Sequence, residues 1–392
     1  MVMTSDRLIG VDSGGYPTQP DADAIIRVVD NELMQAMDLT VPLLTLFGGL
    51  GSFNVSAVKH SWVEDDLWRR RITTWSSIAT SGATSITITG QAHRYPIGTI
   101  LAIEDELMRI TGIVDANTIT VTRGYAGTSA AAHTDTTKMI FVGGSSMHES
   151  DNWVYRPTPV VSLPYNYCQL DHTALGNSWR RQSINMYGRT GAQELDQLTA
   201  QTLAEKTVAI EESLILGQRY SGAAGSPATA GGINYYVTSA NGAGVYNKAG
   251  AALQLAHIYT AIHDRVNVVG QQNVGRLIVV DRWGYEKISS FYAGSRRLTQ
   301  DERVGGATID TLRTPWGDFR VVMHYALQPG NLYILNENFI KVGYLGSTGM
   351  LHTGEIMRND GPFNGRYVYS DITFKVKNVP TMVRIHNYST TS

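Results

Sequence analysis

The chain has 392 residues, of which 43% are hydrophobic and 17% charged, and its 34 acidic and 32 basic side chains give a formal net charge of −2. This balance argues against a dedicated nucleic-acid-binding protein, which usually carries a marked basic excess, although not against a protein that merely encloses nucleic acid. The one cysteine, Cys168, excludes an intramolecular disulfide framework and a four-cysteine zinc site, and the 39 glycines predict many turns and short strands.

The N-terminal region predicts an extended arm. Its first ten residues, MVMTSDRLIG, lack the basic and apolar segments of a signal peptide, and no run of the chain is apolar for the length of a membrane span. We therefore expect a soluble chain that is made in a reducing cytoplasm and has no membrane partner. Turn-forming residues precede one helical stretch, DAIIRVVDNELMQAM, so residues 1–55 are predicted to form an arm with one helix.

Two separated extended segments predict a β-ribbon. In VKHSWVEDDLWRRRI, Val58, His60 and Trp62 alternate with polar residues, which favours a strand. A second extended stretch, YNYCQLDHTALGNSW, begins at Tyr165. Two such segments on either side of a self-contained insert predict the two sides of one long ribbon, with limits at residues 56–71 and 148–186.

The insert, residues 72–147, has the pattern of a small β domain. The segments TSITITG, GTILAIEDELMRITGIV, NTITVTRGYAG and KMIFVGG predict four or five strands joined by turns rich in glycine, aspartate and asparagine. In TITVT, Ile119 and Val121 point to one face and the threonines to the other. The spacing of the strands is typical of a small barrel or sandwich.

The clearest helix of the chain follows the ribbon. TGAQELDQLTAQTLAEKTVAIEESLILG begins with Thr190 and Gln193 spaced as a capping box and ends at Gly217. At 1.5 Å per residue this helix would be roughly 40 Å long. Such a length predicts a spine rather than a packing element of a small domain.

Residues 220–345 predict an α+β domain. Their pattern comprises an extended GGINYYVTS, an amphipathic helix AALQLAHIYTAIHDRV, a buried strand RLIVVD whose Asp281 caps the next helix, and a hairpin TIDTLRTPWGDFRVVMH. In the C-terminal DITFKVK, Ile372 and Phe374 alternate with Thr373 and Lys375. This alternation predicts one packed face and one face that is wet or meets a neighbouring subunit.

The most charged segment, WVEDDLWRRR, allows three interpretations. It places three carboxylates beside three arginines, namely Glu64, Asp65, Asp66, Arg69, Arg70 and Arg71. These side chains could form a catalytic or anion-binding site, a solvated face, or ion pairs between subunits. Adjacent carboxylates on a strand point to opposite faces and converge poorly on one metal ion, which counts against the first interpretation.

No catalytic constellation stands out elsewhere. The chain has no G-x-S-x-G elbow, no G-x-x-x-x-G-K-[ST] loop and no H-E-x-x-H motif. The run Glu104-Asp105-Glu106 lies between two strands and is expected in a solvated hairpin turn, with Ca²⁺ binding as the alternative. Inert packing or surface positions are expected for the remaining candidates, Cys168, His60, His172 and His257. We therefore expect a building block that is not an enzyme and has no metal or cofactor.

The order of these elements resembles the major capsid protein of tailed double-stranded DNA phages, whose shell fold is shared with herpesviruses. KHSWVEDDL and YCQLDHTALGNSW are similar to the two E-loop segments in one branch of that family. The ending FIKVGYLG…GRYVYSDITFKVKNVPTMVRIHN is similar to its closing strands. The resemblance covers the chain apart from residues 72–147, and this insert resembles a small β module that recurs in phage virion proteins.

The resemblance implies an α+β tailed-phage major capsid fold with an inserted small all-β barrel or sandwich domain. In chain order its parts would be an N-arm (1–55), an E-loop (56–71 and 148–186) around the inserted domain (72–147), a P-domain with a spine helix and C-terminal strands (187–220 and 346–392), and an A-domain (221–345).

The resemblance also implies a structural protein that assembles into hexamers and pentamers of an icosahedral head enclosing double-stranded DNA. Expected partners are copies of the chain, packaged DNA through nonspecific contacts, and scaffolding, portal or decoration proteins, with no small-molecule substrate. The expected location is the virion, after synthesis in the host cytoplasm. The subunit-interface candidates are Trp62, Glu64, Asp65, Asp66, Arg69, Arg70 and Arg71.

Three further expectations concern crosslinking and alternative functions. A lysine–asparagine crosslink between subunits, present in some members, is not expected, because the ribbon carries only Lys59 and the insert occupies the tip of the loop. Another virion protein, of the tail or decoration type, is the first alternative function. A glycan hydrolase that uses two carboxylates is the second.

Overall fold

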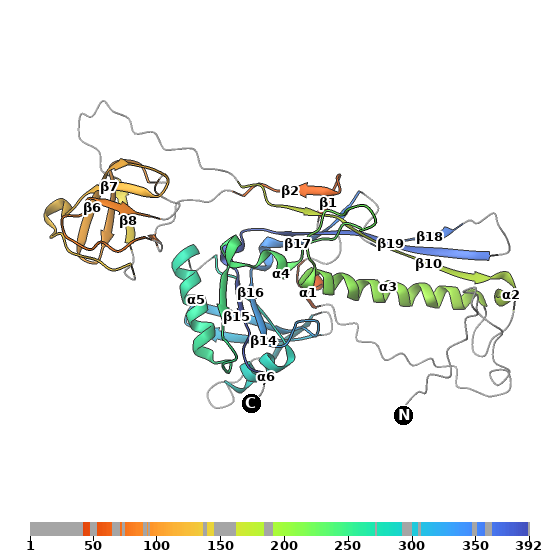
Figure 1. The fold of residues 1–392 in the computed structure, drawn as a ribbon. Helices are drawn as coiled ribbons and strands as arrows, with labels where there is room; N and C mark the ends of the chain where they lie inside the picture. The colour runs from red at the N-terminus through yellow and green to blue at the C-terminus, as the bar shows by residue number, and fades with distance from the viewer. Residues whose placement is uncertain are drawn as a thin grey trace.

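The computed structural model describes most of the chain beyond the N-terminal region (Figure 1). The described residues are 42–47, 53–64, 71–72, 75–88, 92, 95–135, 139–144, 162–183, 191–270, 273–291, 300–304, 307–346, 351–356 and 363–390. The helix expected in residues 23–37 and the predicted cap at Thr190 lie outside them. Within these ranges the chain forms an elongated body, built on a long helix and two sheets, and a separate β module (Figure 1).

A long helix and a five-stranded sheet form one end of the body. The helix, α3 (Gly191–Leu216), lies along strands β10 and β19 and confirms the spine predicted over residues 190–217. It has no proline, and glycine only at its first position, so its helix propensity is uninterrupted. The sheet order is β1-β17-β19-β10, with β18 also paired to β19. Its strands are β1 (Phe53–Val55), β17 (Ile340–Leu345), β19 (Phe363–Val376), β10 (Gln169–Ser178) and β18 (Leu351–Ile356).

The second sheet has seven strands, and its central strand β12 is buried on both faces. In chain order they are β11 (Gly244–Asn247), β12 (Leu277–Val280), β13 (Gln300–Val304), β14 (Ala307–Thr314), β15 (Gly317–Met323), β16 (Asn331–Leu335) and β20 (Val383–His386). In the central strand β12, Leu277 and Val279 enter the core shared with α3, whereas Ile278 and Val280 face α5 (Leu255–Val269) and α6 (Arg282–Ser290). Packing on both faces explains why RLIVVD is apolar without alternation.

Several local predictions in this half of the chain are confirmed. Asp281 caps α6, because its carboxylate accepts a hydrogen bond from the Gly284 N–H at 3.2 Å. The hairpin forms between β14 and β15. The apolar stripe of α5 is buried through Ile258 and Ile262. A cap, a turn and an apolar stripe, each local in the sequence, therefore identify these three elements.

The extended segment expected in GGINYYVTS is wrong, because residues Ile233–Tyr236 form the short helix α4. The glycine before it lies against the end of α3, where an added Cβ of Gly232 would meet the Leu214 and Ser213 carbonyl oxygens at 2.6 Å each. Helical spacing then buries both Ile233 and Tyr236 in the core. Tertiary packing therefore overrides the β propensity of these residues.

The predicted ribbon is present, but its second strand is shorter than expected. Strands β2 (Lys59–Ser61) and β9 (Tyr165–Tyr167) are antiparallel, and the pairing continues to the Glu64–Ser162 bridge. The stretch from Tyr165 to Trp179 does not stay in the ribbon. Its later part is β10, which pairs over ten residues with β19 and packs beside α3.

The insert forms a module with a core of its own. Its six strands follow the order β3-β8-β5-β6-β7-β4. They are β3 (Arg71–Ile72), β4 (Ser85–Thr87), β5 (Thr99–Ile103), β6 (Glu106–Ile113), β7 (Thr118–Thr122) and β8 (Met139–Gly144). Ile119 and Val121 are buried in it, as their alternation predicted. The barrel expectation is wrong, because among the described strands the two outermost, β3 and β4, do not pair and the sheet stays open.

Short helices connect the larger elements. They are α1 (Pro42–Leu46), α2 (Trp179–Gln182) and 3₁₀ turns at Tyr125–Gly127, Ser239–Asn241, Glu337–Phe339 and Val379–Thr381. In the part of the chain that the structure describes, no helix is both long and apolar enough to cross a membrane.

Candidate assembly surface

The root of the ribbon is fixed to the subunit through Trp62. Its side chain is 4% exposed and belongs to the core of the body, with its ring 5.9 Å from that of Tyr236. The indole Nε1 donates to the Glu64 carboxylate at 2.8 Å. The same carboxylate oxygen of Glu64 accepts from the Asn378 N–H at 3.0 Å, just beyond β19. The inner face of the first ribbon strand is therefore fixed to the body.

His60 lies beneath the ribbon and strengthens this attachment. The Thr373 hydroxyl donates to the Tyr167 carbonyl at 3.1 Å, so it accepts from Nδ1 of His60 at 3.2 Å. The other ring nitrogen, Nε2, is buried without a partner, which suits a neutral imidazole. Burial, and secondarily the charge of Lys375, lowers the pKa of His60 to about 4.

Asn166 completes the attachment with a fully bonded buried amide. Its Nδ2 donates to the carbonyls of Gly231 and Phe374, at 2.9 and 2.8 Å. Its Oδ1 accepts from the N–H groups of Gly231 and Tyr167, at 2.8 and 2.9 Å. A single side chain thus joins β9, the loop before α4, and β19.

The opposite face of the ribbon presents apolar side chains to solvent. Trp62 bonds to Pro164 and Glu64 to Ser162, so Val63 and Leu163 lie opposite each other on the other face. They are 64% and 63% exposed, respectively. A two-stranded ribbon cannot cover its own outer face, so this apolar pair is available to another surface.

The seven sequence-predicted interface residues fall into two groups. Trp62 and Glu64 use their side chains inside the subunit. Asp65, Asp66, Arg69 and Arg70 lie outside the described residues, and Arg71 is described only as part of the β3 backbone. Sequence reasoning missed Val63 and Leu163, although the alternation that places His60 and Trp62 on one face of the strand places Val63 on the other face.

A second buried cluster joins three distant segments at Glu211 of α3. Its carboxylate accepts from the N–H groups of Leu43 and Leu44 in α1, at 2.8 and 2.7 Å, and lies 3.0 Å from Nε2 of His324. The other ring nitrogen of His324 accepts from the Ala326 N–H at 3.2 Å, so Nε2 carries the proton and donates to Glu211. The short helix α1 is therefore held against the spine helix α3.

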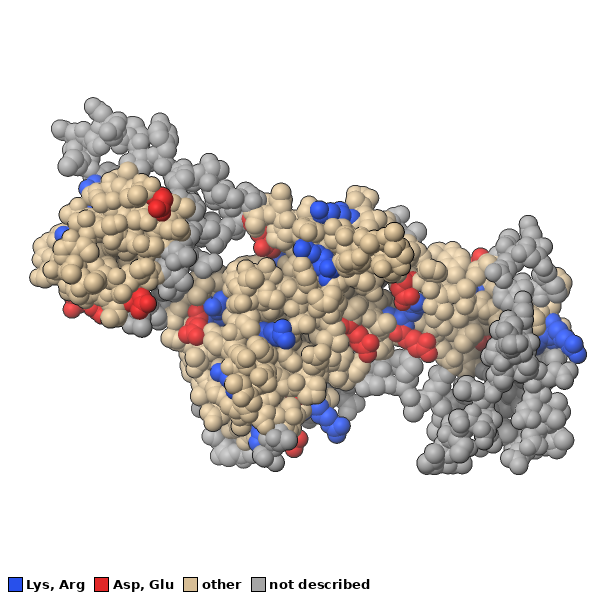
Figure 2. Space-filling view, viewed as in Figure 1, with Lys and Arg blue, Asp and Glu red and all other residues tan. Residues whose placement is uncertain are grey.

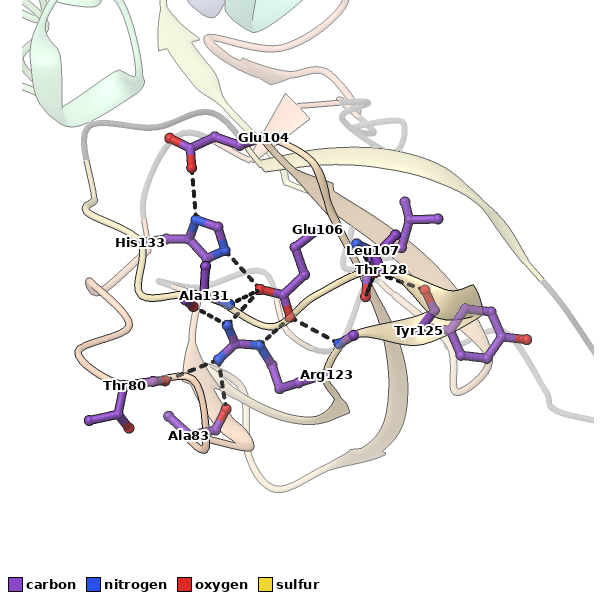
Figure 3. Close-up of polar contacts among 11 residues, drawn as sticks. Thr80, Ala83, Glu104, Glu106, Leu107, Arg123, Tyr125, Thr128, Ala131 and His133 are labelled. Atoms are coloured by element: carbon purple, nitrogen blue, oxygen red, sulfur yellow. Dashed lines mark hydrogen bonds and ion pairs between the residues drawn. The ribbon is translucent and has the colours of Figure 1, made fainter.

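The module is organised around the buried Glu106 (Figure 3). Its carboxylate is held by both Nε and a terminal nitrogen of Arg123, at 2.6 and 2.7 Å, and by the N–H groups of Gly124 and Ala131 at 3.0 Å each. His133 reaches it at 2.8 Å. The expectation that Glu106 is solvated is wrong, whereas Glu104 and Asp105 do form the exposed turn. Five hydrogen bonds make this carboxylate a structural centre.

Metal-binding geometry is not found at these clusters. Across the described ranges, no group of three or more His, Cys, Asp or Glu side chains is placed to hold a metal ion. Apart from Nε2 of His60, the buried polar groups described above bond to one another or to the backbone.

The long helix α3 under one sheet, the second mixed sheet and the two-stranded ribbon form a fold that is also seen in solved capsid structures. Two solved structures share this fold over nearly the whole chain. The cyanophage A-1(L) capsid has 10% identity and a TM-score of 0.52, covering 94% of this chain and 98% of that chain. The capsid of an empty GTA particle has 12% identity and a TM-score of 0.50, covering 96% and 97%.

The family assignment follows from the sequence. The model of the SU10 major capsid protein family matches residues 14–389, so the chain belongs to this family. No curated protein matches the chain. The chain is a structural, non-enzymatic protein of the virion shell, and its copies assemble with one another. This result confirms the capsid prediction and sets aside the tail, decoration and hydrolase alternatives.

Proposed function

We propose that copies of this chain form rings of five and six that close into an icosahedral head around double-stranded DNA. In such a shell the ribbon of each subunit would lie on a neighbouring subunit. The observation that carries this proposal is the ribbon itself, which is locked to its own body on one face by Trp62 and exposes Val63 and Leu163 on the other. Symmetry lets one such surface serve every contact around a ring.

We also propose a division of the chain into structural domains. A hydrophobic core of its own supports a module within residues 72–147. The seven-stranded sheet forms a second core with α5 and α6 on one face, whereas its other face shares a core with α3. We assign the N-arm to residues 1–55, the E-loop to 56–71 and 148–186, the P-domain to 187–220 and 346–392, and the A-domain to 221–345.

Further binding partners of the chain are proposed from its net charge and from the proposed shell. Figure 2 shows acidic and basic side chains interspersed over the visible face of the described residues. With a net charge of −2, contact with packaged DNA would be weak and nonspecific. Scaffolding, portal and decoration proteins would bind the assembled shell, and synthesis would take place in the host cytoplasm.

Electron microscopy and sedimentation velocity of the purified chain test the proposal. Closed shells, or rings of five and six, are expected for the natural sequence. A stacked tube would contradict it. The variant V63D/L163D should leave the thermal midpoint of the subunit unchanged, because both side chains are exposed, and should lower the assembled fraction at least tenfold.

The matched control is V114D, since Val114 is 65% exposed but lies on the module. It should assemble like the natural chain. An equal loss in both variants would show that the ribbon face is not a specific contact.

A further inference from the structure

Three lysines gather on one face of the body next to the root of the ribbon. Lys341 of β17 lies directly opposite Lys375 of β19 in the antiparallel register. Lys377 follows two residues after Lys375 and lies just beyond the end of the strand. These are three of the eight lysines in the whole chain. The clustering is therefore not a consequence of a lysine-rich composition.

The cluster is electrostatically unfavourable within one subunit. Like charges directly opposite each other in a sheet repel. Burial, followed by the charges of Lys377 and Lys341, lowers the pKa of Lys375. In the described parts of the chain no carboxylate lies within ion-pair distance of any of the three ammonium groups.

The apolar surroundings do not supply the missing negative charge. The ammonium of Lys375 lies 5.2 Å from the centre of the Phe53 ring and 5.9 Å from that of Trp62. Both rings are attracted to a cation, but neither carries a charge. Lys341 is exposed and Lys377 is partly exposed. The face is thus accessible to an anionic group from outside the subunit.

The favoured source of that group is a second copy of the chain. Copies of this protein contact one another in a shell, and each carries more acidic than basic side chains. The ammonium of Lys375 lies over the ring of Trp62, whose neighbour Val63 belongs to the exposed face of the ribbon, so the lysines lie near the proposed contact surface. Carboxylates of a neighbour would complement the cluster and remove the repulsion.

We propose that Lys341, Lys375 and Lys377 form the basic half of a contact between subunits, whose acidic half consists of carboxylates on a neighbouring copy. This inference rests on the proposed shell assembly and adds a residue-level site to it. The test of this contact does not require closed shells, because it measures only whether subunits associate.

The test is charge reversal at Lys341 and Lys377, K341E/K377E, with Lys375 kept because it is partly buried beside the Phe53 and Trp62 rings. Sedimentation velocity should show at least a tenfold loss of associated subunits, and K341Q/K377Q should show a smaller loss. The thermal midpoint of the unassembled subunit should stay the same or rise, because repulsion is removed. K248E/K287E, which reverses two lysines of the seven-stranded-sheet region, is the control and should associate normally.

One result would overturn the inference, namely normal association of K341E/K377E with a folded subunit. If that variant had also lost binding to a labelled 20-base-pair DNA duplex, measured by fluorescence anisotropy, the lysines would be assigned to DNA instead. If the natural chain formed rings but never closed shells, the proposed icosahedral head would be refuted. The lysine contact could still be tested on those rings. Complete absence of association in the natural chain would refute both.

Discussion

The Nε2 atom of His324 lies 3.0 Å from a carboxylate oxygen of Glu211, and neither side chain has any exposed surface. Glu211 belongs to the spine helix, and His324 follows strand β15 of the seven-stranded sheet. The two backbone N–H groups of α1 complete the set of donors. One buried carboxylate therefore determines how three parts of the chain meet.

Replacing this carboxylate should destabilise the whole body. Glu211→Gln leaves at least one buried donor without an acceptor, which should lower the free energy of unfolding by about 3 kcal/mol. Urea unfolding of the unassembled subunit measures this. Glu212→Gln, at the exposed neighbouring position, is the control and should change it by less than about 0.5 kcal/mol. Equal effects of the two substitutions would contradict the role given to Glu211.

The module should weaken in acid through Glu106. Burial by itself would raise the pKa of this carboxyl, but hydrogen bonds from Arg123, Ala131, His133 and Gly124 lower it to about 2. A folded-state pKa below that of the unfolded chain gives stability that is present above about pH 4.5 and is lost as the pH falls toward 2. Calorimetry should show a module transition that drops over this range. In Glu106→Gln the transition should be lower at pH 7 and should depend less on pH, because only other carboxylates such as Asp115, whose pKa is lowered by the backbone N–H groups of Asn117 and Thr118, still contribute. An unchanged acid dependence would refute the assignment.

Two glycines of the module offer a matched comparison of backbone strain. Gly124 has φ +60°, and an added Cβ would lie 2.7 Å from the Thr128 carbonyl oxygen. Gly127 has φ +84° and open space around the Cβ position. Gly124→Ala should therefore cost about 2–4 kcal/mol and Gly127→Ala only about 1 kcal/mol. Hydrogen exchange of peptides from β6 and β7 measures both, and the reverse order would contradict the geometry.

Packing of the ribbon on the body should also depend on pH, through His60. Its folded-state pKa of about 4 lies below the ordinary value of 6.5. The stability contributed by the neutral ring is thus complete above about pH 6.5 and is lost as the pH falls toward 4, by up to about 3 kcal/mol. Hydrogen exchange of peptides containing β2 should rise over this range, after correction for intrinsic rates. His60→Gln should remove most of the dependence, whereas His172→Gln, at an exposed position, should not.

Regular local patterns were predicted from the sequence with good accuracy. The propensities between Gly191 and Leu216 identify α3, the side chain of Asp281 identifies the start of α6, and alternation in β19 places Ile372 and Phe374 in the core. The inert packing expected for Cys168 agrees with its burial, which together with Asp371 raises the pKa of the thiol to about 12. In each case the deciding interactions are close in sequence.

The remaining features depend on contacts between distant segments. Thr373 was expected on a wet or subunit-facing side of its strand, but it is buried because His60, more than three hundred residues earlier, lies on it. The pairing of Glu211 with α1 and His324 likewise has separations of 168 and 113 residues. Alternation shows which face a side chain belongs to, but not which element will cover that face.

The first and last strands of the module, β3 and β8, pair antiparallel, with Arg71 opposite Ile140. The two points at which the backbone enters and leaves the module are therefore neighbours. A domain joined through adjacent ends can be gained, lost or exchanged as one genetic cassette without altering the path of the host chain. The subunit thus offers a natural insertion point, at which a foreign domain with similarly close ends could replace the module.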